Sequence, residues 1–240
     1  MQSIEPPSFL TASEDARLRA VELLGDALRA FPTLLSSCTE TLLTISAGTP
    51  SGASKSRVSK SAASNSAERI SSVAVKLLST SVSCMLSSLS GGPTALSVGS
   101  LERQFPSSFT SRLAKFATCG TLVQAKHCAK ALAVVLAAVQ SNASALSAAS
   151  ISTVCSRLLR ELTTPAVLNV ESAMCTAALT SLSQFALAAP IWFMANRGGE
   201  AWRFASSVVA SGLDAGEEQL LCAIKVLAAA TLVLLPYLLS

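Results

Sequence analysis

Residues 13–45 read SEDARLRAVELLGDALRAFPTLLSSCTETLLTI, and this stretch decides the fold class. It opens with Ser13, a good N-cap residue, and two acidic residues follow where they complement a helix dipole. Apolar side chains then recur at the spacing of one helix face: Leu18, Val21, Leu24 and Leu28. Pro32 ends this helix, and a second apolar series begins: Leu34, Leu35, Cys38, Leu42 and Ile45. Two helices joined by a tight turn predict an αα-hairpin.

The same pattern continues towards the C-terminus. Ser66 is expected to open a helix that ends before Gly91-Gly92-Pro93. Further helices are predicted near 109–116, 121–140, 150–162, 171–189, 199–212 and 216–239, with Pro165, Pro190, Gly198-Gly199 and Gly212 as separators. The pairs recur about every forty residues, a period typical of HEAT or armadillo repeats. Since one pair alone cannot bury its apolar face, neighbouring pairs are expected to stack into a solenoid.

Composition agrees with an all-α fold. Hydrophobic residues make up 50% of the 240 residues, enough for a large core, whereas aromatic residues make up only 5%. Ala, Leu and Ser dominate, and small residues allow helix axes to approach closely. Residues 48–66 are different, because they are Ser-rich and basic with almost no large apolar side chains. We therefore predict a helical hairpin over 1–47, a disordered insert over 48–66 and continuing HEAT-like repeats over 67–240.

The charge is concentrated in the middle of the chain. The net charge is +4, but residues 55–130 hold ten basic residues against two acidic ones. Such a segment indicates either solvated helix faces or contact with an acidic protein segment or a DNA backbone.

Residues that carry catalysis or bind metals are scarce. The seven cysteines stand singly without a C-x-x-C pair, and His127 is the one histidine, so the spacing predicts neither a metal site nor a bound cofactor. An odd number of cysteines favours a reducing compartment. No phosphate-binding loop, nucleophile elbow or H-E-x-x-H motif occurs, so no catalytic residue is predicted and the chain is expected not to be an enzyme.

Protein binding is the more plausible activity. Lys126 and Lys130 are four residues apart on one predicted helix face, with Gln124 towards another face, and these three are the candidate partner-binding residues. The alternative for the lysines is that they flank the apolar stripe with their charges in water. Trp192 and Trp202 fit either interface anchors or fillers of gaps between helices.

The C-terminal stretch of residues 220–239 has about the length of a membrane span. Lys225 interrupts it and no basic anchor follows, so a buried repeat helix is favoured over a membrane tether.

Several motifs together resemble one known family. Gln124-Ala125-Lys126 after Gly120 is similar to a Gly-x-Pro-basic-Gln-Ala-Lys run, with Leu122 and Val123 in place of the proline and the basic residue. The flanking stretches that resemble the same family, in order, are 21–24 with Phe31-Pro32, 101–106, 181–190 with Phe193, and 223–227. Ile191 departs from the family's aspartate. The family is that of the precocious-dissociation-of-sisters protein five, which regulates sister-chromatid cohesion.

The resemblance implies a HEAT-repeat scaffold in the nucleus that binds the cohesin complex through its kleisin subunit, together with a Wapl-type release factor. It would act on chromatin during the cell cycle and cell division. The chain would then be a fragment or a divergent member of that family. The alternatives are a HEAT-repeat adaptor unrelated to cohesin and a helical protein tethered to a membrane by its C-terminal apolar helix.

Overall fold

The computed structural model describes residues 12–31, 34–46, 60–90, 107–119, 121–141, 147–164, 167–168, 174–211 and 216–238. Within these ranges the chain is all-helical and holds no strand, which confirms the all-α class. The chain divides into two compact units, residues 1–88 and 89–240, and each is described by itself.

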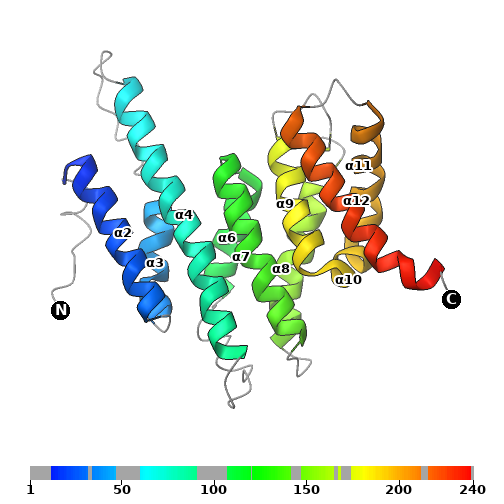
Figure 1. Ribbon diagram of the computed structural model, residues 1–240, viewed down its shortest axis with the longest axis horizontal. Coiled ribbons are helices and arrows are strands. Elements are labelled where there is room, and N and C mark those ends of the chain that lie inside the picture. The colour runs from blue at the N-terminus through cyan, green and yellow to red at the C-terminus, as the bar shows by residue number, and fades with distance from the viewer. Residues whose placement is uncertain are drawn as a thin grey trace. The chain divides into compact units, whose positions relative to one another are not determined.

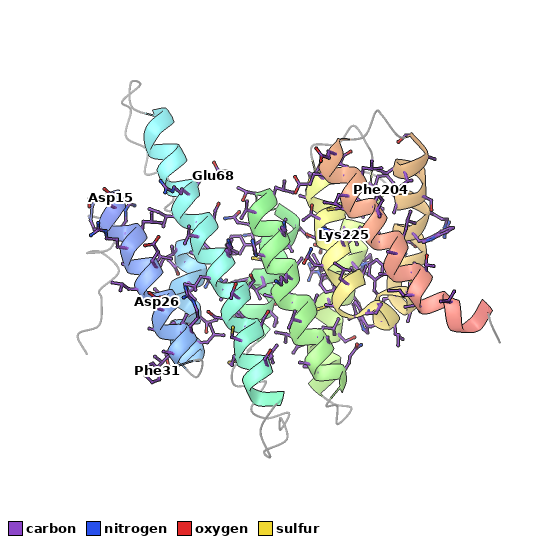
Figure 2. The ribbon with its side chains drawn as sticks, in the orientation of Figure 1. Asp15, Asp26, Phe31, Glu68, Phe204 and Lys225 are labelled. Carbon is purple, nitrogen blue, oxygen red and sulfur yellow. The ribbon has the colours of Figure 1, made fainter. Side chains whose placement is uncertain are left out.

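The first unit contains α2 (Glu14–Ala30), α3 (Leu35–Ser46) and most of α4 (Lys60–Ser90). Ser13 caps α2 as expected, because its hydroxyl oxygen accepts a hydrogen bond from the amide of Ala16 at 3.3 Å. Asp15 and Asp26 are exposed on α2, and Phe31, which follows the helix as its C-cap residue, is exposed as well (Figure 2). The two helices predicted over 13–45 are therefore confirmed, and the first ends at Ala30, just before Pro32.

The core of this unit joins α2 to α4. Val21, Ile70 and Ala74 are buried together, and the half-buried residues packed against them are Leu18, Ile45, Val73 and Leu77. The hydroxyl of Ser71 donates to the carbonyl of Ser46 at 2.5 Å, which fixes α4 against the end of α3.

The expected boundary of the Ser-rich insert is wrong at its C-terminal side. Residues 60–66 belong to α4, whereas the prediction placed them in a disordered segment that ended at Ser66. Once the apolar face from Ile70 onward is packed, extending the helix backwards adds one hydrogen bond per residue fixed, and Ala62 and Ala63 favour this. Residues 48–59 lie outside the described residues, so that part of the prediction stays a prediction.

The second unit contains α6 (Ser107–Cys119), α7 (Leu122–Ser141), α8 (Ser147–Leu162), α9 (Cys175–Ala188), α10 (Pro190–Phe193), η2 (Met194–Gly198), α11 (Gly199–Ser211) and α12 (Glu217–Leu238). Its helices form two rows (Figure 1). In one row α9 packs between α7 and α12, and in the other α8 contacts α6 on one side and η2 on the other. Helices that follow each other in sequence, such as α6 and α7 or α11 and α12, pack across the rows.

A buried hydroxyl helps to hold this arrangement. Ser181 on α9 is fully buried, and its Oγ lies 3.1 Å from the carbonyl oxygen of Ala117 and 3.4 Å from that of Ala125. These acceptors belong to α6 and α7, so one side chain links three helices. A buried hydroxyl without such acceptors would be costly, which explains how the Ser-rich composition is compatible with a packed interior.

The expected break at Gly198-Gly199 is also wrong. The chain stays helical from Pro190 to Ser211, because α10, the π-helical turn η2 and α11 follow each other directly. Gly198 is buried inside the π turn, where a Cβ would lie 2.9 Å from the carbonyl oxygen of Phe193. This glycine therefore permits the wider turn instead of ending the helix.

Two helical segments, Glu68–Ser87 and Leu122–Gln140, are long and apolar enough to cross a membrane by length and composition. In both segments 56% of the apolar window is buried inside the structure, which is also the behaviour of core helices.

Candidate functional site

The three residues predicted to bind a partner lie at the start of α7, but they have different roles. The amide of Thr121 donates to Oε1 of Gln124 at 2.8 Å, and the amide of Gln124 lies 3.3 Å from the hydroxyl of Thr121. This reciprocal pair is a capping box that satisfies amides at the helix start. Only 9% of Gln124 is exposed, so its side chain is used for capping and packing.

Lys126 and Lys130 are both exposed on one face of α7, as their spacing predicted. Within the described ranges neither lysine forms an ion pair. The two charges are therefore available to an acidic partner, and they also fit the simpler interpretation of a solvated helix face.

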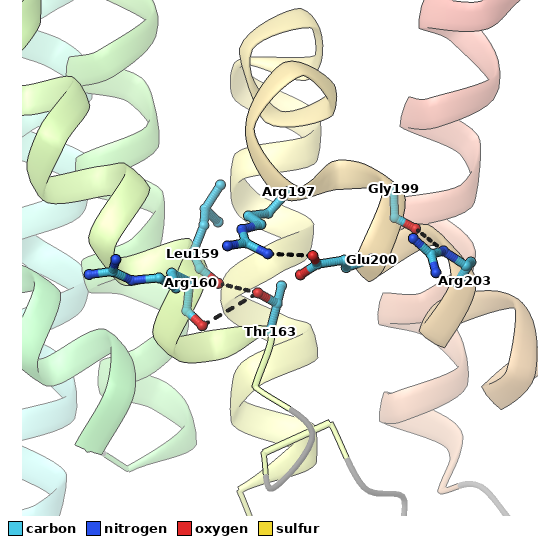
Figure 3. A network of polar contacts seen from close by, with 7 residues as sticks. All are labelled: Leu159, Arg160, Thr163, Arg197, Gly199, Glu200 and Arg203. Carbon is cyan, nitrogen blue, oxygen red and sulfur yellow. Dashed lines mark hydrogen bonds and ion pairs between the residues drawn. The ribbon is translucent and has the colours of Figure 1, made fainter.

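A pocket of about 420 Å³ lies elsewhere in the second unit, beside the π turn. It is lined by Arg160, Thr163, Thr164, Leu168, Arg197, Glu200 and Arg203. Figure 3 shows the polar contacts around Arg160, Arg197 and Arg203. It is an open depression in the surface of this unit. Three guanidinium groups and one carboxylate give the lining an excess of positive charge.

Two side-chain contacts hold the helices around this pocket in place. The indole nitrogen of Trp192 donates to the hydroxyl of Ser152 at 3.1 Å, and the hydroxyl of Ser156 donates to Oδ1 of Asn196 at 2.9 Å. Both contacts join α8 to the helical run that starts at Pro190. They hold the C-terminal end of α8, which carries Arg160, beside the turn that carries Arg197.

The arginine heads do not converge on one point. Arg197 is paired with Glu200, and Nε of Arg203 donates to the carbonyl oxygen of Gly199 at 3.4 Å. In Figure 3 the guanidinium of Arg160 points away from this pair, and no hydrogen bond or ion pair joins it to another described side chain. The pocket therefore offers guanidinium donors to an anionic group, such as a carboxylate, after the side chains rearrange.

The hydroxyl groups in the lining are bonded to the backbone of α8. Thr163 donates to the carbonyl oxygen of Leu159 at 2.8 Å, and Thr164 donates to that of Glu161 at 3.1 Å. Both hydroxyls therefore satisfy carbonyl groups at the C-terminal end of α8.

Of the six cysteines whose burial the structure describes, Cys128, Cys155, Cys175 and Cys222 are buried. Burial raises the pKa of Cys128 to about 12 and that of Cys155 to about 12, because a charged thiolate would lose its hydration there. These two thiols are therefore protonated at neutral pH and are poor nucleophiles. Among the described residues no three His, Cys, Asp or Glu side chains are grouped to hold a metal ion.

The two tryptophans differ in environment. Trp192 is buried, and its ring lies 6.2 Å from that of Phe185 between centroids, so it fills a gap between helices. Trp202 is 42% exposed on α11.

Sequence reasoning missed the arginine pocket. Arg160 lies 37 residues before Arg197 in the chain, and no local motif links them. Only the packing of α8 against η2 brings these parts of the chain together.

In comparisons with protein families, with curated proteins and with solved structures, no match to this chain is found.

Proposed function

We propose that the chain is a non-catalytic helical-repeat scaffold of the HEAT or armadillo type that works by binding other proteins. The arginine-lined pocket is the observation that carries this proposal, because its three guanidinium groups against one carboxylate make it a positively charged surface that suits an acidic partner. The two-row packing of α6 to α12 supports the repeat type, since α9 packs between α7 and α12 while α8 packs beside α6.

The proposed ligand of the pocket is an acidic segment of a partner protein. A carboxylate from the partner would compete with Glu200 for Arg197 and accept hydrogen bonds from Arg203. The exposed pair Lys126 and Lys130 adds positive charge on α7, in the same unit.

By resemblance, the proposed partner is the cohesin complex, bound through its kleisin subunit in the nucleus and tuned by a Wapl-type release factor. The motifs that carry this resemblance occupy packing positions, since Ala125, Phe185 and Ala223 are fully buried. They support a shared helical stack, and the assignment to cohesin depends on their order along the chain.

A capture experiment tests both levels of the proposal. The tagged full chain is expected to co-purify with cohesin from its own cells, and Arg160→Glu with Arg203→Glu is expected to lower the capture at least tenfold. Arg157→Glu is the matched control, because Arg157 lies one turn earlier on α8, pairs with Glu161 and does not line the pocket.

The outcomes separate the alternatives. Arginine-dependent capture of other proteins without cohesin would identify an adaptor unrelated to cohesin. Retention in the membrane fraction after carbonate extraction would favour the membrane-tethered protein. If the double variant Arg160→Glu, Arg203→Glu captures all partners as well as the unchanged chain does, the proposed site is wrong.

A further inference from the structure

The outward face of α12 carries an apolar stripe with no covering element in the described structure. The large members are exposed to 51% at Leu221, 48% at Ile224, 72% at Leu232 and 45% at Leu235. Ala228, also exposed, lies in the middle of the series. At 100° per residue these five positions fall within an arc of about 80°, so they form one continuous strip along the helix.

The opposite face of α12 already holds the helix in the fold. Cys222, Ala223, Val226, Ala229 and Ala230 are buried, and α12 packs on α9 and α11. The apolar stripe is therefore additional to the contacts that fold this unit. Exposed apolar side chains that are scattered singly need no explanation, but a contiguous strip of them marks an interaction surface.

The stripe is symmetric about Ala228. Leu221 and Leu235 lie seven residues to either side of it, and Ile224 and Leu232 lie four residues to either side. The side chains are also symmetric in size, because large aliphatic side chains lie on both sides of the small Ala228. A two-fold interface requires a surface patch that is complementary to itself, and this stripe has that property.

We propose that a second copy of this chain covers the stripe, with the two α12 helices antiparallel and crossing at Ala228. In this pairing Leu221 meets Leu235 of the other copy, and Ile224 meets Leu232 of the other copy. The small side chain at the crossing point lets the two helix axes approach, while the larger side chains interlock on either side. The stripe is about 21 Å long, which is short for an interface, so we expect a reversible, concentration-dependent dimer.

Charge favours the antiparallel arrangement over the parallel one. Glu217 and Glu218 are exposed at the start of α12, and Lys225 is half-buried beside the stripe. In a parallel pair each of these charges would lie next to its own copy, and like charges repel. In the antiparallel pair the two acidic ends lie at opposite ends of the interface, and the two Lys225 residues are about 9 Å apart along the helix axis.

Analytical ultracentrifugation of the full chain tests the dimer. The apparent mass is expected to rise with concentration from 24.6 kDa towards twice that value. Ile224→Asp is expected to keep the mass at the monomer value, with an unchanged helical circular dichroism spectrum, because residue 224 is not part of the fold's core. Ile191→Asp is the matched control, since Ile191 is 76% exposed on α10 and should leave the dimer intact.

Disulfide cross-linking tests the geometry. Ala228→Cys is expected to yield a covalent dimer on mild oxidation, above the level of the unchanged chain with its native cysteines. Leu221→Cys alone should give no such dimer, whereas a mixture of Leu221→Cys with a size-tagged Leu235→Cys should give the mixed one. Cross-links of position 221 with itself would overturn the antiparallel pairing.

Two further results would contradict the proposal that a second copy of the chain covers the stripe. One is a monomer at every accessible concentration. The other is a monomer that floats with phosphatidylcholine–phosphatidylserine vesicles and loses this binding in Ile224→Asp, which would assign the stripe to a membrane surface. The arginine-pocket variants should leave dimerisation unchanged, so failure of this inference is distinguishable from failure of the proposed function.

Discussion

Gly198 and Gly199 are neighbours in the helical run from Pro190 to Ser211, yet their surroundings differ. A Cβ on Gly198 would lie 2.6 Å from the sulfur of Met194 and 2.9 Å from the carbonyl oxygen of Phe193. A Cβ on Gly199 would meet nothing within 4 Å. The π turn therefore requires a glycine at position 198, whereas position 199 has room for a larger side chain.

Gly198→Ala is expected to destabilise the second unit by about 1–3 kcal/mol, because the backbone oxygen of Phe193 has little room to move. Gly199→Ala is expected to be neutral or to stabilise by about 0.5–1 kcal/mol, as alanine restricts the unfolded chain and favours helix. Urea unfolding followed by tryptophan fluorescence measures both. Equal effects of the two substitutions would contradict the tight turn.

The buried thiols make stability depend on pH. Burial raises the pKa of Cys128 and that of Cys155 from the ordinary value of 9.0 to about 12. Above pH 9 the unfolded chain therefore binds fewer protons than the folded one, so the free energy of unfolding falls as pH rises.

We expect each of these two thiols to lower the free energy of unfolding by about 1 kcal/mol between pH 8 and pH 10. The measurement is the slope of unfolding free energy against pH, compared with that of Cys128→Ala combined with Cys155→Ala. The double variant will be less stable at every pH because of its cavities, but its slope should be shallower. An identical slope would show that these thiols are not the cause.

At the scale of the element, the start of α7 shows how a motif can serve the helix itself. Thr121 and Gln124 satisfy each other's backbone amides, and Lys126 and Lys130 are exposed two and six residues after Gln124. This run of residues thus contains Gln124, whose side chain caps the helix, and two lysines whose charges are exposed.

Gln124→Ala is expected to cost about 0.5–2 kcal/mol of stability through loss of the cap, without changing partner capture by the folded protein. Lys126→Glu with Lys130→Glu should do the reverse, leaving stability within about 0.5 kcal/mol and weakening capture of an acidic partner. Thermal unfolding and capture at a temperature below both transitions distinguish the two effects. If Gln124→Ala reduces capture and the double lysine variant does not, Gln124 itself contacts the partner.

At the scale of the whole molecule, the chain has two cores. Leu42 is fully buried in the first unit, and Leu136 is fully buried in the second. Both tryptophans, Trp192 and Trp202, belong to the second unit, so tryptophan fluorescence reports on that unit while circular dichroism reports on all helices.

Leu42→Ala and Leu136→Ala are each expected to cost about 2–5 kcal/mol in their own unit. If the units unfold separately, Leu42→Ala shifts part of the circular dichroism transition and leaves the fluorescence midpoint unchanged, whereas Leu136→Ala shifts the fluorescence midpoint. A fluorescence midpoint that moves equally in both variants would show a single cooperative unit.

Local patterns predicted much of the fold but little of the site. The apolar period over 13–45 was sufficient for α2 and α3, and the Thr121 start of α7 was also correct. The Gly198-Gly199 break was wrong because glycine in a helix pattern has two meanings, a stop or a close approach, and only the position of Phe193 distinguishes them. The arginine pocket was not predictable because its members come from separate elements.

The sequence by itself determined that this chain is helical, because the three- and four-residue spacing of apolar side chains is a local property that needs no partner helix. Only the tertiary structure decided which apolar faces are used. Leu221 and Cys222 are neighbours in one apolar helix, yet the first is 51% exposed and the second 4%. The difference arises because α9 and α11 cover one side of α12, and burial depends on what a side chain faces rather than on its type.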